Sequence, residues 1–306
     1  MTNKRPDGEP VRAMDDNGEV GDGGERARPV AANDTTAFEQ DQPIHERVGD
    51  GGSQADQIRK LAQEAKPELP KRFYTDASVV AASDGSHAIH LDGRAVRTPA
   101  RNNLSLPNAA LAESVASEWR AQGERIDPQS MPLTRLANTT CDGVASNMQR
   151  VRDEIVQYAG SDLVCYRADT PAGLVAQQIA HWDPVLNWAA DRIGADFTTS
   201  SGVMPVSQTD AALDCVAIAV SDLEPFSLAA LHVVMTLTGS ALIGLAVIDG
   251  KLTPDDAWLA AHVDEDWQIS QWGEDAEASA RRAIRRREFD AACHVIALTT
   301  GTAASR

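Results

Sequence analysis

The apolar centre of the chain reads Phe226-Ser-Leu-Ala-Ala-Leu-His-Val-Val-Met-Thr-Leu-Thr-Gly-Ser-Ala-Leu-Ile-Gly-Leu-Ala-Val-Ile248 and contains no Asp, Glu, Lys or Arg. A run of this length could span a membrane. Against a membrane span, it contains polar residues such as His232 and Thr236, and neither flank carries a cluster of Lys or Arg. The membrane reading stays open, but the pattern favours the central buried helix of a helical domain, broken near Gly239.

The next segment is predicted to form one helix, Trp258-Leu-Ala-Ala-His-Val-Asp-Glu-Asp-Trp-Gln-Ile-Ser-Gln-Trp-Gly273. Thr253 can cap it, Pro254 suits the first helical position, and Gly273 can end it. At about 100° per residue, one narrow face carries Glu265 in the middle of mainly apolar side chains. The other members of that face are Trp258, His262, Ile269 and Trp272, while Leu259, Val263 and Trp267 are expected to hold the helix in the bundle.

Glu265 at the centre of an apolar face needs a physical explanation, since burying an unpaired charge costs several kcal/mol or raises the pKa of the carboxyl group. One explanation is a structural pair with an Arg or His elsewhere in the fold. The other is a groove in which Glu265 meets a binding partner. Periodicity alone does not choose between them.

The part of the chain before the helices divides into a tail and a small sheet. Residues 1–66 are rich in Gly, Asp, Glu, Asn and Gln, which predicts a disordered acidic tail. A β-rich domain is expected at residues 67–135. It would contain strands at 73–82, 88–91, 95–98 and 104–106, tight turns at Asp84-Gly85 and Asp92-Gly93, and a helix from Pro107 to Gly123.

Residues 136–306 are predicted to form an α-helical domain, which makes the fold class α+β, a small N-terminal sheet with a packed helix followed by a mainly α-helical bundle. Helical spacing of apolar residues marks residues 145–159, 174–182, 210–220 and 276–298. A helix break is expected at Trp182-Asp183-Pro184, with Asp183 capping a new helix. Only residues 196–200 look extended.

The amino-acid composition limits the classes of partner that this chain can bind. The formal net charge of -17 argues against nucleic acid and anionic membranes, because both require a basic surface. Arg281, Arg282, Arg285, Arg286 and Arg287 crowd the last helix, and they are expected to pair internally with the carboxylates at 264–266. Four widely spaced cysteines and the absence of a leader pattern predict free thiols in a bacterial cytoplasm.

Common catalytic signatures are absent from the sequence. It contains no GxxxxGK[ST], no GxGxxG after a strand, no HExxH and no GxSxG. No cofactor or metal site is therefore expected. One enzyme alternative stays open, a carboxylate-dependent hydrolase centred on Asp264, Glu265 and Asp266.

Several segments taken together resemble a known family, the F1-ATPase assembly chaperones that bind the unassembled alpha subunit, found in mitochondria and alphaproteobacteria. The resemblance covers roughly residues 70–298. It rests on Lys71-Arg72-Phe73-Tyr74, Leu91-Asp92-Gly93-Arg94 with Thr98-Pro99, Glu118-Trp119, Asp162-Leu163-Val164-Cys165-Tyr166-Arg167, Trp182-Asp183-Pro184 and the segment 265–273.

This resemblance implies a nucleotide-free, non-enzymatic chaperone that binds the F1 alpha subunit and shields the apolar surface later covered by a beta subunit. It favours Glu265 as the functionally important acidic position and implies a partner-binding set of Glu265, Asp266, Trp267, Gln268 and Trp272. The free protein is expected to be a monomer, without nucleic acid and without stable membrane insertion.

Overall fold

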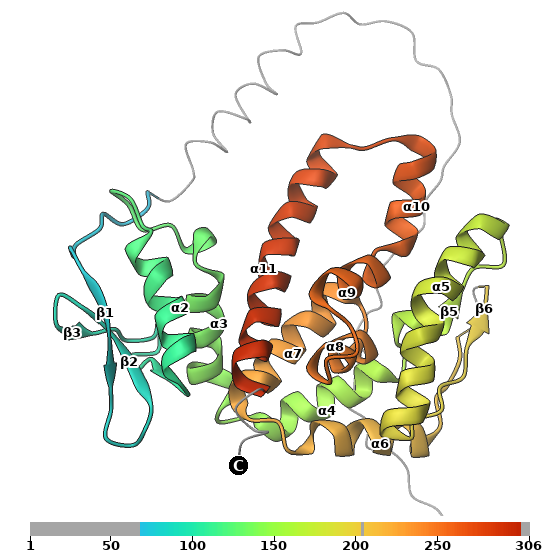
Figure 1. Cartoon of the computed structure of the whole chain (residues 1–306), viewed down its shortest axis with the longest axis horizontal. Coiled ribbons are helices and arrows are strands. Elements are labelled where there is room, and N and C mark those ends of the chain that lie inside the picture. The colour runs from blue at the N-terminus through green and yellow to red at the C-terminus, as the bar shows by residue number, and fades with distance from the viewer. Residues whose placement is uncertain (1–67, 203–204, 301–306) are drawn as a thin grey trace, which may run out of the picture. The chain divides into compact units, whose positions relative to one another are not determined.

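The computed structural model describes residues 68–202 and 205–300, so the predicted tail at 1–66 lies outside the described residues. The described chain begins with a small antiparallel sheet (Figure 1). Its strands are β1 (Ala77–Ala81), β2 (His87–Leu91), β3 (Arg94–Ala95) and β4 (Ser105–Leu106). Strand β2 pairs with each of the other three. The turn between β2 and β3 places Asp92 at φ 45° and Gly93 at φ 81°, the positive values that a tight hairpin requires.

The first strand is shorter than predicted, because β1 begins at Ala77 instead of residue 73. Just before it, the carbonyl oxygen of Asp76 still accepts from the N–H of Asp92 at 3.1 Å, and side chains bond the backbone of residues 74–76. The guanidinium of Arg72 donates to the carbonyl oxygens of Tyr74 (3.0 Å) and Thr75 (2.8 Å). The carboxylate of Asp92 accepts from the N–H of Thr75 and, at 2.9 Å, of Asp76. These side-chain contacts replace strand pairing before Asp76.

Helix α2 (Ala109–Arg120) packs on the sheet, with Leu111 and Val115 buried. Asn108 caps it by accepting a hydrogen bond from the N–H of Leu111 at 2.9 Å, one residue after the predicted start at Pro107. The hydroxyl of Tyr74 donates to the carbonyl oxygen of Trp119 at 2.8 Å. That bond attaches the entry of the described chain to the end of α2.

Helices make up most of the remaining described chain, which confirms the α+β fold class. They are α3 (Pro132–Thr139), α4 (Met148–Ala159), α5 (Ala172–Trp188), α6 (Asp210–Ser221), α7 (Pro225–Thr238), α8 (Ala241–Ile248), α9 (Pro254–Ala261), α10 (Val263–Trp272) and α11 (Ala276–Thr300). A two-stranded parallel sheet of β5 (Tyr166–Arg167) and β6 (Ser200–Ser201) flanks α5. The predicted extended segment at 196–200 thus reaches a strand only at its end.

The uncharged run forms two buried helices, α7 and α8, and the predicted break falls at Gly239, which adopts φ 74°. Ser240 caps α8 by accepting from the N–H of Ile243 at 2.9 Å. Helix α11 packs along α7 and also contacts α8. Across residues 68–202 and 205–300, none of the helices has the length and apolar character needed to cross a membrane.

Helix α5 continues through Pro184, so the break predicted at Trp182-Asp183-Pro184 is wrong. A proline inside a helix costs roughly 3 kcal/mol because it lacks the N–H and crowds the preceding turn. Tertiary contacts on both sides offset that cost. Trp182 is buried and its Nε1–H donates to the carbonyl oxygen of Ala260 at 2.7 Å, while Asp183 is ion-paired with Arg167 at 2.9 Å instead of capping a helix.

One hydrophobic core connects the sheet with the helices. It contains Ile89 and Leu106 from the strands, Val115 from α2, and Leu242 and Ile296 from the helical part. The boundary at residue 135 between a β-rich and a helical domain therefore stays a prediction. The cysteines are free thiols as predicted: Cys165 and Cys293 are buried, whereas Cys141 and Cys215 are half-buried.

Candidate partner-binding site

The predicted single helix over residues 258–273 is two helices that meet at His262. His262 leaves the helical region at φ −118° and ψ 20°, and its Nδ1 lies 2.8 Å from the carbonyl oxygen of Trp258. The ring thereby occupies the carbonyl that the backbone N–H of residue 262 would use in a continuous helix. That N–H instead donates to Leu259, and the carbonyl of His262 starts α10 by accepting from Asp266.

This junction removes the continuous apolar face that the periodicity suggested. Trp258 is 6% exposed and Trp272 is 88% exposed, so the two indoles lie in different environments. Leu259, expected in the core, is 45% exposed, whereas Val263 is buried as predicted. Glu265 therefore does not interrupt a buried stripe. Its side chain is 38% exposed at the start of α10.

The junction rests on aromatic contacts and on α11. The rings of Trp258 and His262 stack with centroids 3.9 Å apart, and Trp258 also contacts Phe289 at 5.2 Å. Because a carbonyl oxygen only accepts, the Nδ1 atom of His262 carries the proton. Among the described residues the buried Nε2 has no hydrogen-bond partner, and burial lowers the pKa of His262 below its ordinary value.

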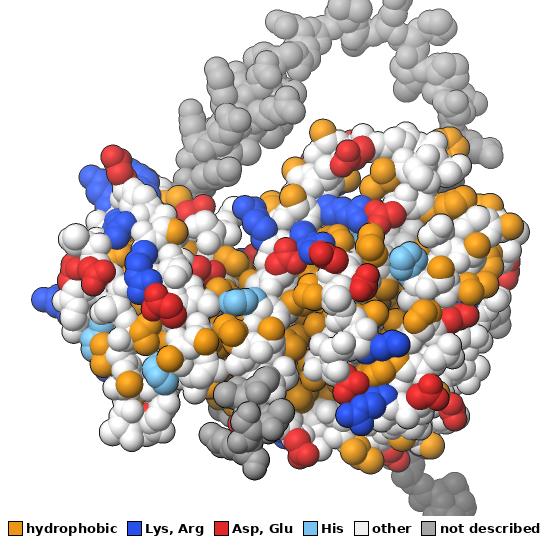
Figure 2. Space-filling view, in the orientation of Figure 1, with side chains coloured by type: hydrophobic (Ala, Val, Ile, Leu, Met, Phe, Trp, Pro, Cys, Tyr) orange, Lys and Arg blue, Asp and Glu red, His pale blue; other side chains and the backbone are white. Residues whose placement is uncertain are grey.

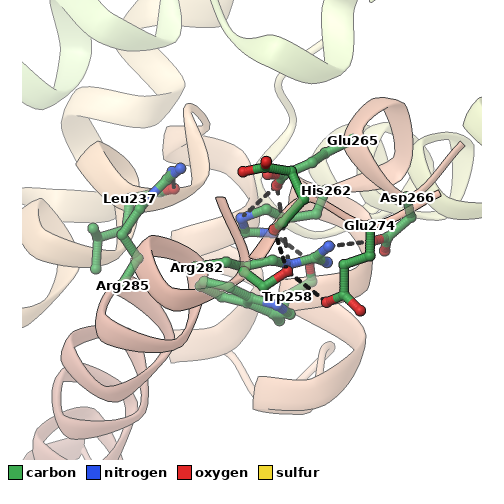
Figure 3. A network of polar contacts seen from close by, with 10 residues as sticks. Leu237, Trp258, His262, Glu265, Asp266, Glu274, Arg282 and Arg285 are labelled. Carbon is green, nitrogen blue, oxygen red and sulfur yellow. Dashed lines mark hydrogen bonds and ion pairs between the residues drawn. The ribbon is translucent and has the colours of Figure 1, made fainter. Parts of the chain in front are cut away.

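The three successive carboxylates of α10 differ in their contacts, and Figure 3 shows two of them, Glu265 and Asp266, beside Arg282. Asp264 accepts from the side-chain amide of Gln178 on α5 at 2.7 Å. Asp266 forms the close ion pair, 2.5 Å from Arg282. Glu265 lies between its neighbours, 3.8 Å from Nε2 of His262 and 4.0 Å from Nε of Arg282. It is near both the His and the Arg that a structural pair would need, yet it makes no close contact with either.

Within the described residues, the predicted pairing of the α11 arginines with the α10 carboxylates is confirmed at Arg282 and is wrong for Arg281, Arg285 and Arg286, which contact other groups. Arg281 is paired with Glu277, and Arg286 with Asp255 and Asp290. Arg285 donates to the carbonyl oxygen of Leu237 at 2.7 Å (Figure 3). These contacts attach α11 to α7, α9 and α10.

The remaining predicted site residues divide into packing and exposed positions. The indole of Trp267 lies against Gly173 at the start of α5, so this side chain holds α10 on α5. Gln268 is exposed, as is Trp272 near the end of the helix. Gly273 then ends α10 at φ 86°, as predicted. The side chain of Asp266 is as exposed as that of Glu265, 38%, but it pairs closely with Arg282, so Glu265, Gln268 and Trp272 are the members of the predicted set left for a partner.

Two acidic residues from the segments that carry the family resemblance, Glu118 and Asp162, cap the N-termini of helices distant from them in sequence. The sequence patterns did not reveal this role. Glu118 accepts from the N–H groups of Leu133 and Thr134, each at 2.8 Å, because Met131, the N-cap residue that precedes α3, has a side chain that cannot cap. Asp162 is fully buried and accepts from Leu242 at the start of α8. Both pairs are distant in sequence, so no local capping signal could have predicted them.

The fold is similar to those of solved structures. A solved structure of a chaperone candidate from Agrobacterium tumefaciens is 46% identical, with a TM-score of 0.73 over 78% of this chain and 89% of that one. Atp12 from Paracoccus denitrificans is 40% identical, with a TM-score of 0.70 over 75% of this chain and 98% of that one. These likenesses define the class as a chaperone of the α+β type described above.

The particular family follows from the sequence comparisons. The profile described as "ATP12 chaperone protein" matches residues 71–190. Protein ATP12 of Saccharomyces cerevisiae mitochondria is 24% identical in an alignment 254 residues long, which covers 68% of this chain and 78% of the yeast protein. The chain belongs to the ATP12 chaperone family, the family of ATP synthase assembly that the resemblance indicated. Helix α10 lies beyond the residues that the profile matches.

Proposed function

We propose that this chain acts in the assembly of the F1 sector of ATP synthase by binding the unassembled alpha subunit and shielding the surface that a beta subunit later covers. Membership of the ATP12 family carries the proposal. An unassembled subunit exposes apolar surface that favours aggregation, so a binder of that surface protects it until the correct partner arrives.

Helix α10 supports this role by its geometry. Its outer end presents Trp272, an amphipathic side chain of the type enriched at binding hot spots. Glu265 keeps acceptor capacity for a basic group, because Nε of Arg282 is 4.0 Å from its carboxylate and the neutral His262 ring is 3.8 Å from it. In the proposed set, Glu265, Gln268 and Trp272 contact the client, while Asp266 and Trp267 hold α10 in position through Arg282 and Gly173.

The proposed activity is binding without chemistry, by a monomer in a bacterial cytoplasm. The hydrolase alternative gains no support from the geometry of Asp264, Glu265 and Asp266. Shared acid–base or metal chemistry requires side chains that converge on one substrate position. Here Asp264 contacts Gln178 on α5, whereas Asp266 contacts Arg282 on α11.

The test is aggregation of isolated F1 alpha subunit in the presence of the purified full chain, without ATP. We expect light scattering to fall in proportion to the added chain and to level off once the alpha subunit is saturated. An unrelated aggregating enzyme serves as the control client. Protection of that enzyme with no effect on the alpha subunit would contradict the proposal.

A further inference from the structure

The first half of α5 exposes a surface without charge. Residues 171–182 contain no Asp, Glu, Lys or Arg, although charged residues make up 24% of the chain. Ile179 is 50% exposed. The other exposed positions here are small or uncharged, among them Ala172, Ala176 and Ala180. A run of exposed apolar positions on a well-packed helix is typical of a contact surface.

This surface continues onto α10. The Trp267 indole lies against Gly173 and so joins the two helices, and residues 267–273 also contain no charged side chain. Hydrophobic side chains gather over α5 and the adjacent end of α10 in the space-filling view (Figure 2). Trp272, at 88% the most exposed large apolar side chain in the described part of the chain, is the last residue of α10. We call residues 171–182 and 267–273 together the α5–α10 surface.

Acidic side chains border the α5–α10 surface. Asp169 precedes α5 and is exposed, Glu265 lies two residues before the uncharged part of α10, and Glu274 and Asp275 follow it and are exposed. The whole chain carries a net charge of -17. A second copy of this chain would bring the same carboxylates against each other, and an anionic membrane would be repelled. The complementary occupant is an apolar protein segment flanked by Lys or Arg.

We propose that the α5–α10 surface is one docking site, and that it takes an uncharged apolar segment with basic flanks from the unassembled alpha subunit. Ile179 and Trp272 supply apolar contacts and the bordering carboxylates meet the flanking cations. This inference rests on the proposed function and extends it, because sequence reasoning assigned α5 only to the helical bundle. The signal in the sequence was the uncharged run at 171–182.

The experiment compares two exposed isoleucines in the full-length chain. Ile179→Lys places a charge within the α5–α10 surface, and Ile218→Lys places the same charge on α6, where Ile218 is 72% exposed. Binding of fluorescently labelled F1 alpha subunit is measured for both, together with thermal unfolding. Because burying an unpaired ammonium in an apolar contact is unfavourable, we expect Ile179→Lys to weaken binding by about tenfold or more. Ile218→Lys should bind like the parent chain.

A further variant and the pattern of results distinguish failure of the docking-site proposal from failure of the proposed function. Ile179→Ser removes the apolar contact without adding charge and should weaken binding by a smaller factor. If the parent chain binds the alpha subunit and all Ile179 variants bind equally well, the α5–α10 surface is not the docking site, while the proposed function stands. If the parent chain does not bind the alpha subunit, the proposed function falls. Sedimentation showing that the parent chain dimerises and Ile179→Lys does not, with client binding unchanged, would assign the surface to self-association and overturn the inference.

Discussion

Gly173 of α5 and Trp267 of α10 lie so close that a side chain at position 173 has no room. A Cβ atom on Gly173 would lie 2.3 Å from Cη2 of the Trp267 indole and 2.8 Å from Cζ3. The missing side chain of one residue thus sets the position of the other, and with it the placement of α10 on α5. Trp182 and Gln178 reinforce this contact from α5 through hydrogen bonds to Ala260 and Asp264.

Gly173→Ala should therefore destabilise the chain although alanine favours helices. The helix-propensity gain is roughly 1 kcal/mol, whereas displacing a rigid indole in a packed contact costs about 1–3 kcal/mol. We expect a net loss of stability and weaker client binding, measured by chemical denaturation and by alpha-subunit titration. Gly143→Ala is the matched control, since a Cβ atom there meets nothing within 4 Å. Equal stability of the two variants would show that Trp267 moves freely.

Glu265→Gln should leave thermal stability nearly unchanged and weaken alpha-subunit binding by about 1–3 kcal/mol, the scale of one charge-assisted contact. The reason is that, among the described residues, Glu265 has no close cationic partner: Nε of Arg282 lies 4.0 Å from its carboxylate, and Nε2 of His262, at 3.8 Å, belongs to a neutral ring. Glu277→Gln on α11 is the control, because Glu277 is 82% exposed and outside the proposed site. A sharp fall in the melting temperature with intact binding would instead make Glu265 structural.

Asp162→Ala should be among the more destabilising single changes in the helical part. In the parent chain, the carboxylate of Asp162 accepts from the buried N–H groups of Leu242 at 3.0 Å and Val164 at 3.2 Å. The alanine variant leaves both N–H groups without this acceptor, and an unsatisfied buried donor costs about 1–3 kcal/mol. Asp162→Asn retains one acceptor oxygen, so we expect this variant to lose less stability than Asp162→Ala. Urea denaturation of both variants tests this order, and equal stability of Asp162→Ala and the parent chain would contradict it.

His262→Asn should reduce the pH dependence of stability. Burial lowers the pKa of folded His262 below its ordinary 6.5, so the unfolded chain binds the proton first as pH falls. The stability linked to neutral His262 is therefore present above about pH 6.5 and is lost as pH falls towards the folded pKa. Asn can still donate to the carbonyl of Trp258 but does not titrate.

The measurement for His262 is the difference in unfolding free energy between about pH 7.5 and about pH 5.5, compared between His262→Asn and the parent chain. The comparison is needed because Asp162 acts in the opposite direction. Burial raises the pKa of Asp162 from 3.8 to about 6, so its contribution becomes less favourable as pH rises through that range. The same pH difference in both proteins would show that His262 does not carry the effect.

Local chemistry was sufficient to predict elements whose ends are fixed by neighbouring residues. Asp92-Gly93 adopts the positive φ values of a hairpin, Gly239 ends α7, and Thr253 caps α9. In each case the residue that determines the backbone lies within a few positions of the backbone it determines. The composition of the uncharged run at 226–248 was likewise sufficient to predict that it is buried.

Predictions failed where a distant group took over a backbone contact or offset a local cost. Pro184 remains inside α5 because Trp182 is anchored to Ala260, far along the chain. The break at His262 arises because the imidazole takes the carbonyl of Trp258. A hydrophobic period counted through residue 262 therefore placed Glu265 on a stripe that does not exist.

The sequence by itself determined the α+β class, the buried α7–α8 pair, the free thiols and, through motif resemblance, the family. Only the tertiary structure decided that Trp267 packs on Gly173 while Trp272 remains exposed, and that Asp266 instead of Glu265 closely pairs with Arg282. Helical periodicity gives the direction of a side chain around its own axis. What that side chain meets depends on the neighbouring helix, and the contacts that place α5 and α11 beside α10 join residues far apart in the chain.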